Sequence, residues 1–485
     1  MKTERNLILL AGIISLSAIP SFLFLGEKSF WGDEILSVLF ARESWSSMCR
    51  TLSLREANMS LYYVLLKLWL RLGDSEFTVR TLSVLFALLS LPTYFFIAFR
   101  LFGRVAGQIS CFLLAVNAFF VQYAQEARSY SLLLLLTGIS SLCLLRALER
   151  PDRCRIAGYA ISSALAVYSH FFALFVLAAH AVSLLLLKGE DIARRRILWC
   201  VLPIAALLSP LAAVVPAWGK RQIAWVPGPT PKSVFLLFEH FAGHSIPLLV
   251  LLSFAVIFAF RSGIRSRRDF PGSRAMWSHL FLALWLFLPI LGALLVSLWK
   301  PVFVPRFLLV SLPPFLLAAG AGLAEIRRPL LRGSALALIA FFSIFALAGY
   351  YQARKADWRA ATNLVLSEVR PGDSVLFYEA SGRLFFDFYR GKTRLGENSL
   401  INAYPARYGM EDFLRGGEEG PTPEQLRSIG ENSRRVWLVL YHDRIPGMGK
   451  DSRYIVEFLD GRFPGRTAKW FSGVRILLYR SGEEK

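Results

Sequence analysis

Residues 81–99 read TLSVLFALLSLPTYFFIAF, a run of nineteen residues without a charged side chain. A helix needs about 20 predominantly apolar residues to cross the hydrocarbon core of a bilayer. Lipid offers the backbone no hydrogen-bond partner, so a segment that spans a membrane in this way must be helical. The run therefore predicts a transmembrane helix, and similar runs recur along most of the chain.

The composition of the 485-residue chain agrees with a polytopic membrane protein. Hydrophobic residues make up 55% and charged residues only 18%, whereas a soluble domain carries about 25% charged residues. The apolar runs predict about eleven transmembrane helices. Their expected bounds are Leu7–Leu25, Thr81–Phe99, Val105–Val121, Ser131–Leu148, Ile156–Ser169, Phe171–Leu187, Ile197–Ala217, Ile246–Phe260, Met276–Trp299, Phe307–Leu323 and Ser334–Tyr350. From the sequence, Ile156–Leu187 is either a tight hairpin or one long span.

The basic residues in the short loops predict the orientation. With the N-terminus inside, most Lys and Arg residues fall on the inner side, including Arg194–Arg196 and Arg265–Arg268. This alternation requires Ile156–Leu187 to cross twice, and it explains most of the net charge of +21 without nucleic acid. No A-x-A cleavage site follows the first span, so it is expected to be a retained anchor. We expect a multi-pass protein of the inner (plasma) membrane with a cytoplasmic N-terminus.

The composition changes at about Gln352. Short β-rich runs at Ser374–Tyr378, Val436–Tyr441 and Val474–Tyr479 lie among helical patterns and turn signals, which indicates a small α/β domain. The odd number of spans places this domain outside. The predicted fold class is an α-helical polytopic membrane domain over residues 1–351, with a large first outer loop at 26–80, followed by an extracytoplasmic α/β domain over residues 352–485.

The first outer loop contains WGDE at residues 31–34, so two adjacent carboxylates, Asp33 and Glu34, follow shortly after a span. A carboxylate fixed at the membrane surface can act as a general base toward an acceptor hydroxyl. The alternative is that both acids only cap the following helix, because negative charge suits a helix N-terminus.

A second group of charges lies in QYAQEARSY at residues 122–130, between two predicted spans joined by almost no loop. An unpaired charge near hydrocarbon is costly, so Glu126 and Arg128 each need a partner or a ligand. Arg128 could bind phosphate, with Glu126 holding it or binding an acceptor. The alternative is a structural ion pair with Arg80 or Asp33.

Arg306 opens the tenth predicted span on the outer side. A guanidinium can engage phosphate oxygens bidentately, so Arg306 is a candidate phosphate ligand. Its alternative role is interfacial anchoring. His170 lies at the expected outer turn between spans five and six, and a lone histidine in such a place is more often structural.

Motifs of soluble nucleotide and metal enzymes are missing from the sequence. It contains no GxxxxGK[ST], no GxGxxG after a strand and no HExxH. The histidines lack zinc spacing and the five cysteines show no disulfide framework. ATP-driven transport by this chain is therefore not expected.

Taken in order, these pieces resemble the GT-C class of integral-membrane glycosyltransferases. The resemblance is to glycosyltransferase family 39-like proteins, which are related to protein O-mannosyltransferases and the lipid A aminoarabinose transferase. It covers most of residues 1–375. The motifs that carry it are WGDE at 31–34, LYY at 61–63 with Trp69, SEFTVR at 75–80, YAQEARSY at 123–130, YSH at 168–170, PRFL at 305–308 with PP at 313–314, and DWR at 357–359.

The resemblance implies a polyprenyl-phosphate-linked sugar donor and an inverting transfer of a hexose or pentose to an unknown glycan, lipid or protein acceptor at the outer face. By position, Asp33 would be the catalytic base with Glu34 beside it, and Arg128 and Arg306 would contact the phosphate. The remaining residues implied at the donor site are Glu126, His170, Tyr123 and Tyr62.

The chain departs from this family at Asn58-Met59-Ser60, where many relatives have His-Pro-Pro. We therefore predict no obligatory metal ion, with a divalent metal as the alternative, and no other cofactor. No nucleic-acid partner is expected, because the loop charges account for most of the net charge. A lipid or sugar transporter or flippase is the main alternative function, although no inverted repeat is visible and the candidate site charges lie on the outer side. An O-antigen ligase or polymerase is a further alternative within the same broad class.

Overall fold

The chain forms two compact units in the computed structural model. The first comprises Met1–Leu25 and Ser44–Ala353, and the second comprises Gly26–Glu43 and Arg354–Lys485. The structure describes residues 2–54, 56–187, 191–214, 226–269, 274–393, 402–415, 420–441 and 452–482. Each unit is described by itself.

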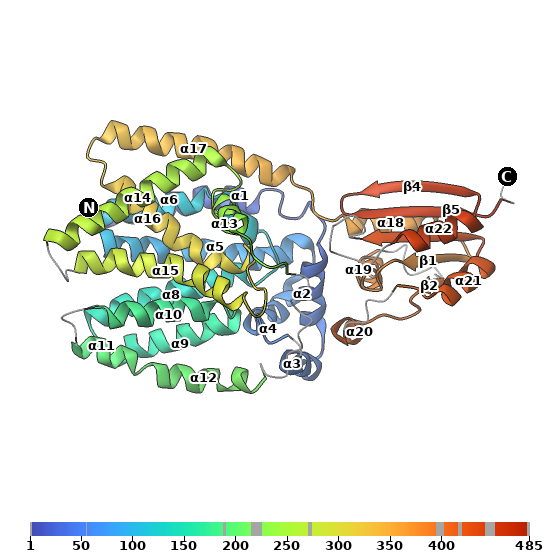
Figure 1. Cartoon of the computed structure of the whole chain (residues 1–485), viewed down its shortest axis with the longest axis horizontal. Coiled ribbons are helices and arrows are strands. Elements are labelled where there is room, and N and C mark those ends of the chain that lie inside the picture. The colour runs from blue at the N-terminus through green and yellow to red at the C-terminus, as the bar shows by residue number, and fades with distance from the viewer. Residues whose placement is uncertain are drawn as a thin grey trace. The chain divides into compact units, whose positions relative to one another are not determined.

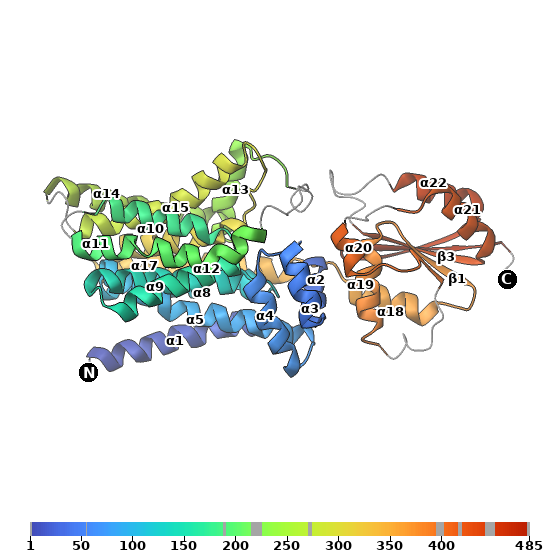
Figure 2. The ribbon, with the colours of Figure 1, turned by 90° about the horizontal axis from the view of Figure 1, so that it is seen from below.

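The first unit is a bundle of helices (Figures 1 and 2). Its helices are α1 Lys2–Phe22, α3 Trp45–Leu54, α4 Ser60–Trp69, α5 Glu76–Phe102, α6 Arg104–Ala115, α7 Ala118–Ala124, α8 Tyr130–Glu149, α9 Arg153–Ser169, α10 Ala173–Leu185, α11 Asp191–Leu198, α12 Val201–Val214, α13 Pro231–Phe241, α14 Ile246–Asp269, α15 Arg274–Val296, α16 Leu312–Ala324 and α17 Pro329–Gln352, with the short 3-10 turns η1 Leu70–Leu72 and η4 Phe307–Ser311.

Within the described residues, seven helices are long and apolar enough to cross a membrane, or eight if α6 and α7, which are bent by 62°, form one span. Each of the eleven expected spans overlaps a helix or this bent pair. The three that do not meet the length and hydropathy criteria are α1, α9 and α10. The chain is thus a multi-pass membrane protein, and the count of eleven stays a prediction.

The segment Ile156–Leu187, expected as either a hairpin or one long span, contains the helices α9 and α10. They are separate helices joined by the turn His170–Phe172. The hydroxyl of Tyr159 on α9 lies 3.4 Å from Nδ1 of His180 on α10, and these residues are almost equally far from the turn. The segment is therefore a hairpin and not one long helix.

Small residues let α16 pack deep inside the bundle. A Cβ added to Gly320 would collide with Ser110 on α6, and one added to Gly322 would collide with the carbonyl group of Ala255 on α14. Glycine at helix interfaces allows backbones to approach closely in membrane bundles. This packing fixes the helix that directly follows Arg306 and η4.

The second unit is a five-stranded sheet with helices on both faces. Its strand order is β2-β1-β3-β5-β4, with β1, β2 and β3 parallel and β5 antiparallel to both β3 and β4. The elements are α2 Gly32–Arg42, α18 Trp358–Glu368, β1 Asp373–Phe377, α19 Ser381–Arg390, β2 Asn402–Tyr404, α20 Met410–Arg415, α21 Pro423–Asn432, β3 Arg435–Tyr441, α22 Arg453–Arg462, β4 Gly465–Phe471 and β5 Val474–Arg480.

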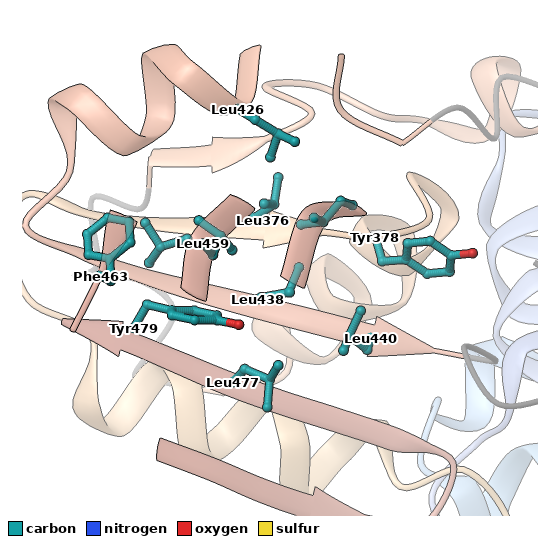
Figure 3. Packing of buried hydrophobic residues seen from close by; sticks show 11 residues of the cluster. Leu376, Tyr378, Leu426, Leu438, Leu440, Leu459, Phe463, Leu477 and Tyr479 are labelled. Carbon is teal, nitrogen blue, oxygen red and sulfur yellow. The ribbon is translucent and has the colours of Figure 1, made fainter. Parts of the chain in front are cut away.

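Alternation along β3 divides the two faces of this sheet. Leu438 and Leu440 point into a buried cluster with Leu459 of α22 and Tyr479 of β5 (Figure 3). Tyr441 faces the other way, and its ring lies 5.0 Å from that of Trp358 on α18. The predicted α/β fold of this region is confirmed.

A buried ion pair joins β1 and β3. Arg435 and Asp373 are only 4% and 3% exposed, and their Nη2 and Oδ2 atoms are 2.6 Å apart. The indole nitrogen of Trp437 donates to the same carboxylate at 2.9 Å, and so does the backbone N–H of Arg370 at 3.0 Å. These donors compensate the cost of burying the carboxylate.

Candidate active site

The turn between α9 and α10 fixes the state of His170, which is 2% exposed. The backbone N–H of Phe172 donates to Nδ1 of His170 at 3.2 Å. Since Nδ1 accepts, the neutral ring carries its proton on Nε2. Burial lowers the pKa of His170 to about 3, and the positive charges of Arg128 and Arg306 act in the same direction. Among the described residues, Nε2 has no hydrogen-bond partner.

Arg128 and Arg306 reach this histidine from different parts of the first unit. Arg128 precedes α8, and Arg306 precedes η4. The guanidinium carbon of Arg306 lies 5.6 Å from the ring centre of Phe307, and that ring lies 5.2 Å from the imidazole of His170. Two guanidinium groups near one neutral imidazole make this region suited to an anion.

Tyrosine rings and a buried acid border the same region. The ring of Tyr130 lies 5.9 Å from that of His170 and 4.9 Å from that of Tyr123. Tyr123 is within electrostatic range of both Glu126 and Arg306, and Glu126 is only 4% exposed. The structure thus gathers five of the predicted residues, Tyr123, Glu126, Arg128, His170 and Arg306, in one part of the first unit.

Gln125 anchors the loop that carries Glu126 and Arg128. Its Nε2 atom lies 3.0 Å from the carbonyl oxygen of Pro20 and 2.8 Å from that of Leu23. The hydroxyl of Tyr350 on α17 donates to its Oε1 atom at 2.9 Å. The backbone between α7 and α8 is therefore tied to the ends of α1 and α17.

Tyr62 stands apart from this group and reaches it through another side chain. It is fully buried on α4, and its hydroxyl lies 3.1 Å from the Oγ atom of Ser83. The Ser83 hydroxyl in turn donates to the carbonyl oxygen of Arg128 at 3.3 Å. Tyr62 thus supports the backbone at Arg128.

The departure from the family pattern at residues 58–60 acquires a structural role. The side-chain oxygen of Asn58 accepts a hydrogen bond from the backbone N–H of Phe171 at 3.1 Å. The hydroxyl of Ser60 donates to the carbonyl oxygen of Tyr168 at 3.3 Å. These two side chains hold the backbone on both sides of His170.

The two carboxylates of the WGDE motif lie in the second unit and differ in their surroundings. Glu34 is fully buried, and its Oε2 atom lies 3.7 Å from Nζ of Lys355. The same oxygen accepts the backbone N–H of Trp31 at 3.4 Å, so Glu34 closes the first turn of α2. Asp33 is partly exposed. The expected capping role therefore falls to Glu34.

Because Gly32 has no side chain, Phe385 and Tyr441 can lie close to the backbone next to Asp33. A Cβ at this position would lie 3.3 Å from the hydroxyl oxygen of Tyr441 and 3.1 Å from the ring of Phe385. Burial raises the pKa of Tyr441 above its usual range, and the negative charges of Asp33 and Glu379 add to the rise. Asp33 thus lies within electrostatic range of a buried phenol.

Metal binding has no candidate cluster within the described ranges. There, no three His, Cys, Asp or Glu side chains come together in a way that could hold an ion. The absence of an obligatory metal ion stays a prediction from the sequence.

Several contributing residues were missed from the sequence. Tyr130 lies within the quoted motif, and an aromatic residue between two spans was a usable signal. Lys355 and Tyr441 had no signal, because nothing local relates either residue to the WGDE motif.

Residues 60–217 match the family model for dolichyl-phosphate-mannose-protein mannosyltransferase. Among solved structures, the chain is similar to ArnT from Cupriavidus metallidurans in the apo state, with a TM-score of 0.61 and 13% identity over 99% of this chain and 98% of that one. For the same protein bound to undecaprenyl phosphate, the TM-score is 0.58 and the sequence identity is 13% over 98% of each chain.

The archaeal oligosaccharyltransferase AglB from Archaeoglobus fulgidus, in complex with an inhibitory peptide and a dolichol-phosphate, is also similar. Its TM-score is 0.53, with 12% identity over 100% of this chain and 75% of that one. No curated protein matches significantly. These likenesses confirm the predicted GT-C fold class.

Proposed function

We propose that this chain, with its GT-C fold, is a glycosyltransferase that moves a sugar from a polyprenyl-phosphate-linked donor to an acceptor hydroxyl. The observation that carries the proposal is the placement of Arg306, which lies against Phe307 beside the buried His170, together with the positive charge that Arg128 brings to the same histidine. The ligands of the similar structures, undecaprenyl phosphate and dolichol-phosphate, support the donor class. The matching family model is named for dolichyl-phosphate-mannose.

The donor chemistry explains the choice of residues in the first unit. A polyprenyl phosphate resides in the membrane and becomes the leaving group, so negative charge grows on its phosphate in the transition state. Arg128 and Arg306 stabilise that charge, and the Nε2–H group of His170 donates a further hydrogen bond. The donor is already activated, so no nucleotide site is needed.

The acceptor half of the reaction uses Asp33 as general base. Its carboxylate takes the proton of the acceptor hydroxyl while the oxygen attacks the anomeric carbon and the bond from that carbon to the phosphate oxygen breaks. The configuration at the anomeric carbon is inverted. Asp33 suits this role better than Glu34 because Asp33 is partly exposed, whereas Glu34 is buried against Lys355. Base catalysis of this kind contributes about 10²–10⁴-fold.

We further propose the inner (plasma) membrane as the location, with a cytoplasmic N-terminus and residues 352–485 outside. The distribution of Lys and Arg along the chain supports this orientation. The acceptor is a glycan, lipid or protein, and the reaction would then take place at the outer face.

The test uses the purified full-length protein in detergent, with a polyprenyl-phosphate monosaccharide and an envelope extract as acceptor source. We expect free polyprenyl phosphate and a glycosylated product, both strongly reduced in Asp33→Asn. A transporter or flippase would form neither product, because it leaves the bond between sugar and phosphate intact; product formation in detergent therefore separates the two functions. Turnover only with a lipid-linked oligosaccharide would instead indicate a ligase or polymerase. Full activity of a well-folded Asp33→Asn variant would refute the assignment of the base.

A further inference from the structure

The segment Gly26–Glu43 is held by residues from the far end of the sequence. The hydroxyl of Ser29 donates to the carbonyl oxygen of Ala356 at 2.8 Å, across 327 positions. The backbone N–H of Phe30 donates to the hydroxyl of Tyr389 on α19 at 2.7 Å. These bonds attach the chain just before α2 to the second unit.

Apolar contacts extend this attachment along α2. Phe30, Ile35 and Val38 are fully buried, and the ring of Phe30 lies 6.0 Å from that of Phe388 on α19. The guanidinium carbon of Arg42, at the end of α2, lies 5.2 Å from the centre of the same Phe388 ring. Both ends of the segment therefore contact one helix of the second unit.

Glu34 is the fully buried carboxylate of this attachment. Burying a carboxylate is costly unless a cation and hydrogen-bond donors compensate it, and removing one partner of a buried pair is strongly destabilising. The Nζ atom of Lys355 and the backbone N–H of Trp31 supply that compensation. Lys355 is the second residue of the chain after it enters the second unit at Arg354.

We propose that Glu34 and Lys355 are positioning residues, and that the ion pair between the fully buried Glu34 and the partly exposed Lys355 fixes α2 on the second unit and thereby sets the orientation of Asp33. This inference rests on the proposed function of Asp33 as base. Successive side chains on a helix point about 100° apart, as 3.6 residues per turn require. Holding Glu34 inward therefore leaves Asp33 on a different face of α2, where it is accessible.

The role assigned here differs from that of a second catalytic carboxylate. A buried Glu34 in contact with Lys355 does not meet a substrate hydroxyl. Glu34 instead holds α2 in position, so its replacement should increase local opening along the whole helix. We therefore measure amide hydrogen exchange in α2, which reports local opening of the helix independently of any reaction.

The test is hydrogen–deuterium exchange of the full-length protein in detergent. Glu34→Gln and Lys355→Met should each speed exchange across α2 by about tenfold or more, since each removes the attraction between the buried carboxylate and the ammonium group that holds it. The double variant should exceed neither single variant, and Lys355→Arg should restore slow exchange. Asp33→Asn should leave α2 as protected as in the parent protein.

A matched control removes an exposed ion pair of the same unit. Arg466 and Asp460 are 2.8 Å apart and about half exposed, so Asp460→Asn should leave exchange in α2 unchanged. Unchanged exchange in Glu34→Gln and Lys355→Met would overturn the proposal. So would effects that simply add in the double variant, because they would mean that the two residues act independently.

Activity separates this inference from the proposed function. Glu34→Gln should lower kcat more than it changes KM for the donor, and the midpoint of the acidic limb of the pH profile should stay where it is. A shifted midpoint would make Glu34 the titrating group and contradict its positioning role. If Asp33→Asn stays active, the proposed base fails, yet the exchange data still decide whether Glu34 and Lys355 hold α2.

Discussion

The backbone nitrogen of Phe172 lies 3.2 Å from Nδ1 of His170 and donates its hydrogen to that atom. This hydrogen bond determines which ring nitrogen of the imidazole can donate to a ligand. The ring nitrogen that remains, Nε2, carries the proton, and Arg128 and Arg306 place positive charge near the ring.

His170→Ala should lower transfer by about 10–100-fold, the value of one hydrogen bond to a charged group. His170→Gln should be milder, because its amide can still donate. The measurement is kcat and KM for the polyprenyl-phosphate donor at several donor concentrations. Equal loss in the two variants, with normal expression, would show that the ring has only a packing role.

His170 should also affect stability at low pH. Its pKa is lowered by burial to about 3 in the folded chain, against about 6.5 when unfolded. The unfolded state therefore binds the proton first as the pH falls. The contribution of this neutral histidine is complete above pH 6.5 and is lost progressively toward pH 3. The thermal unfolding temperature of the parent should fall on acidification through this window more than that of His170→Gln. Identical pH dependence of the two unfolding temperatures would contradict the assignment.

Replacing either arginine by lysine keeps the charge but removes the bidentate geometry. Arg128→Lys and Arg306→Lys should each reduce kcat by about 10²-fold, in the range measured for loss of one transition-state donor. Arg155→Lys is the control, because Arg155 lies in an exposed pair with Asp152 at the start of α9. If Arg155→Lys lost as much activity as the other two variants, Arg128 and Arg306 could not be assigned a specific role in binding the phosphate.

Asp373→Asn should destabilise the second unit by about 3–5 kcal/mol, since it leaves Arg435 buried without its carboxylate. The change lies outside the proposed chemistry, so any loss of transfer should follow the unfolded fraction. Denaturant unfolding followed by tryptophan fluorescence can report on it, because Trp437 donates to Asp373. An unfolding midpoint equal to that of the parent would show that the network contributes little.

Much of the first unit could be predicted because its determinants are local. Apolar runs such as Thr81–Phe99 predict spans, and span ends on one side of the membrane bring loop residues together. Arg128 and Arg306 were proposed from guanidinium chemistry and from the family resemblance, His170 from the resemblance, and the structure gathers the three. The strands β1, β3 and β5 were equally readable, because they are buried almost throughout.

The rest depends on pairings that leave no local trace. The edge strand β4, GRTAKWF, was missed because its side chains are largely exposed and no apolar run appears. The expected outer loop at 26–80 is divided between the two units, since Gly26–Glu43 packs with the C-terminal residues. Capping by Glu34 was a stated alternative, but its ion pair with Lys355 was not, because hundreds of positions separate the two residues.

The attachment of Gly26–Glu43 to residues near the opposite terminus also imposes an order on biosynthesis. The ribosome delivers this segment hundreds of positions before Lys355 and α19, which hold it, and domains fold as units once their parts are available. Until Lys355 and α19 have been synthesised, the segment lacks these contacts, so Asp33 acquires its final environment only afterwards. A nascent chain that has not yet reached these residues therefore contains Asp33 but lacks the contacts that hold α2 in place.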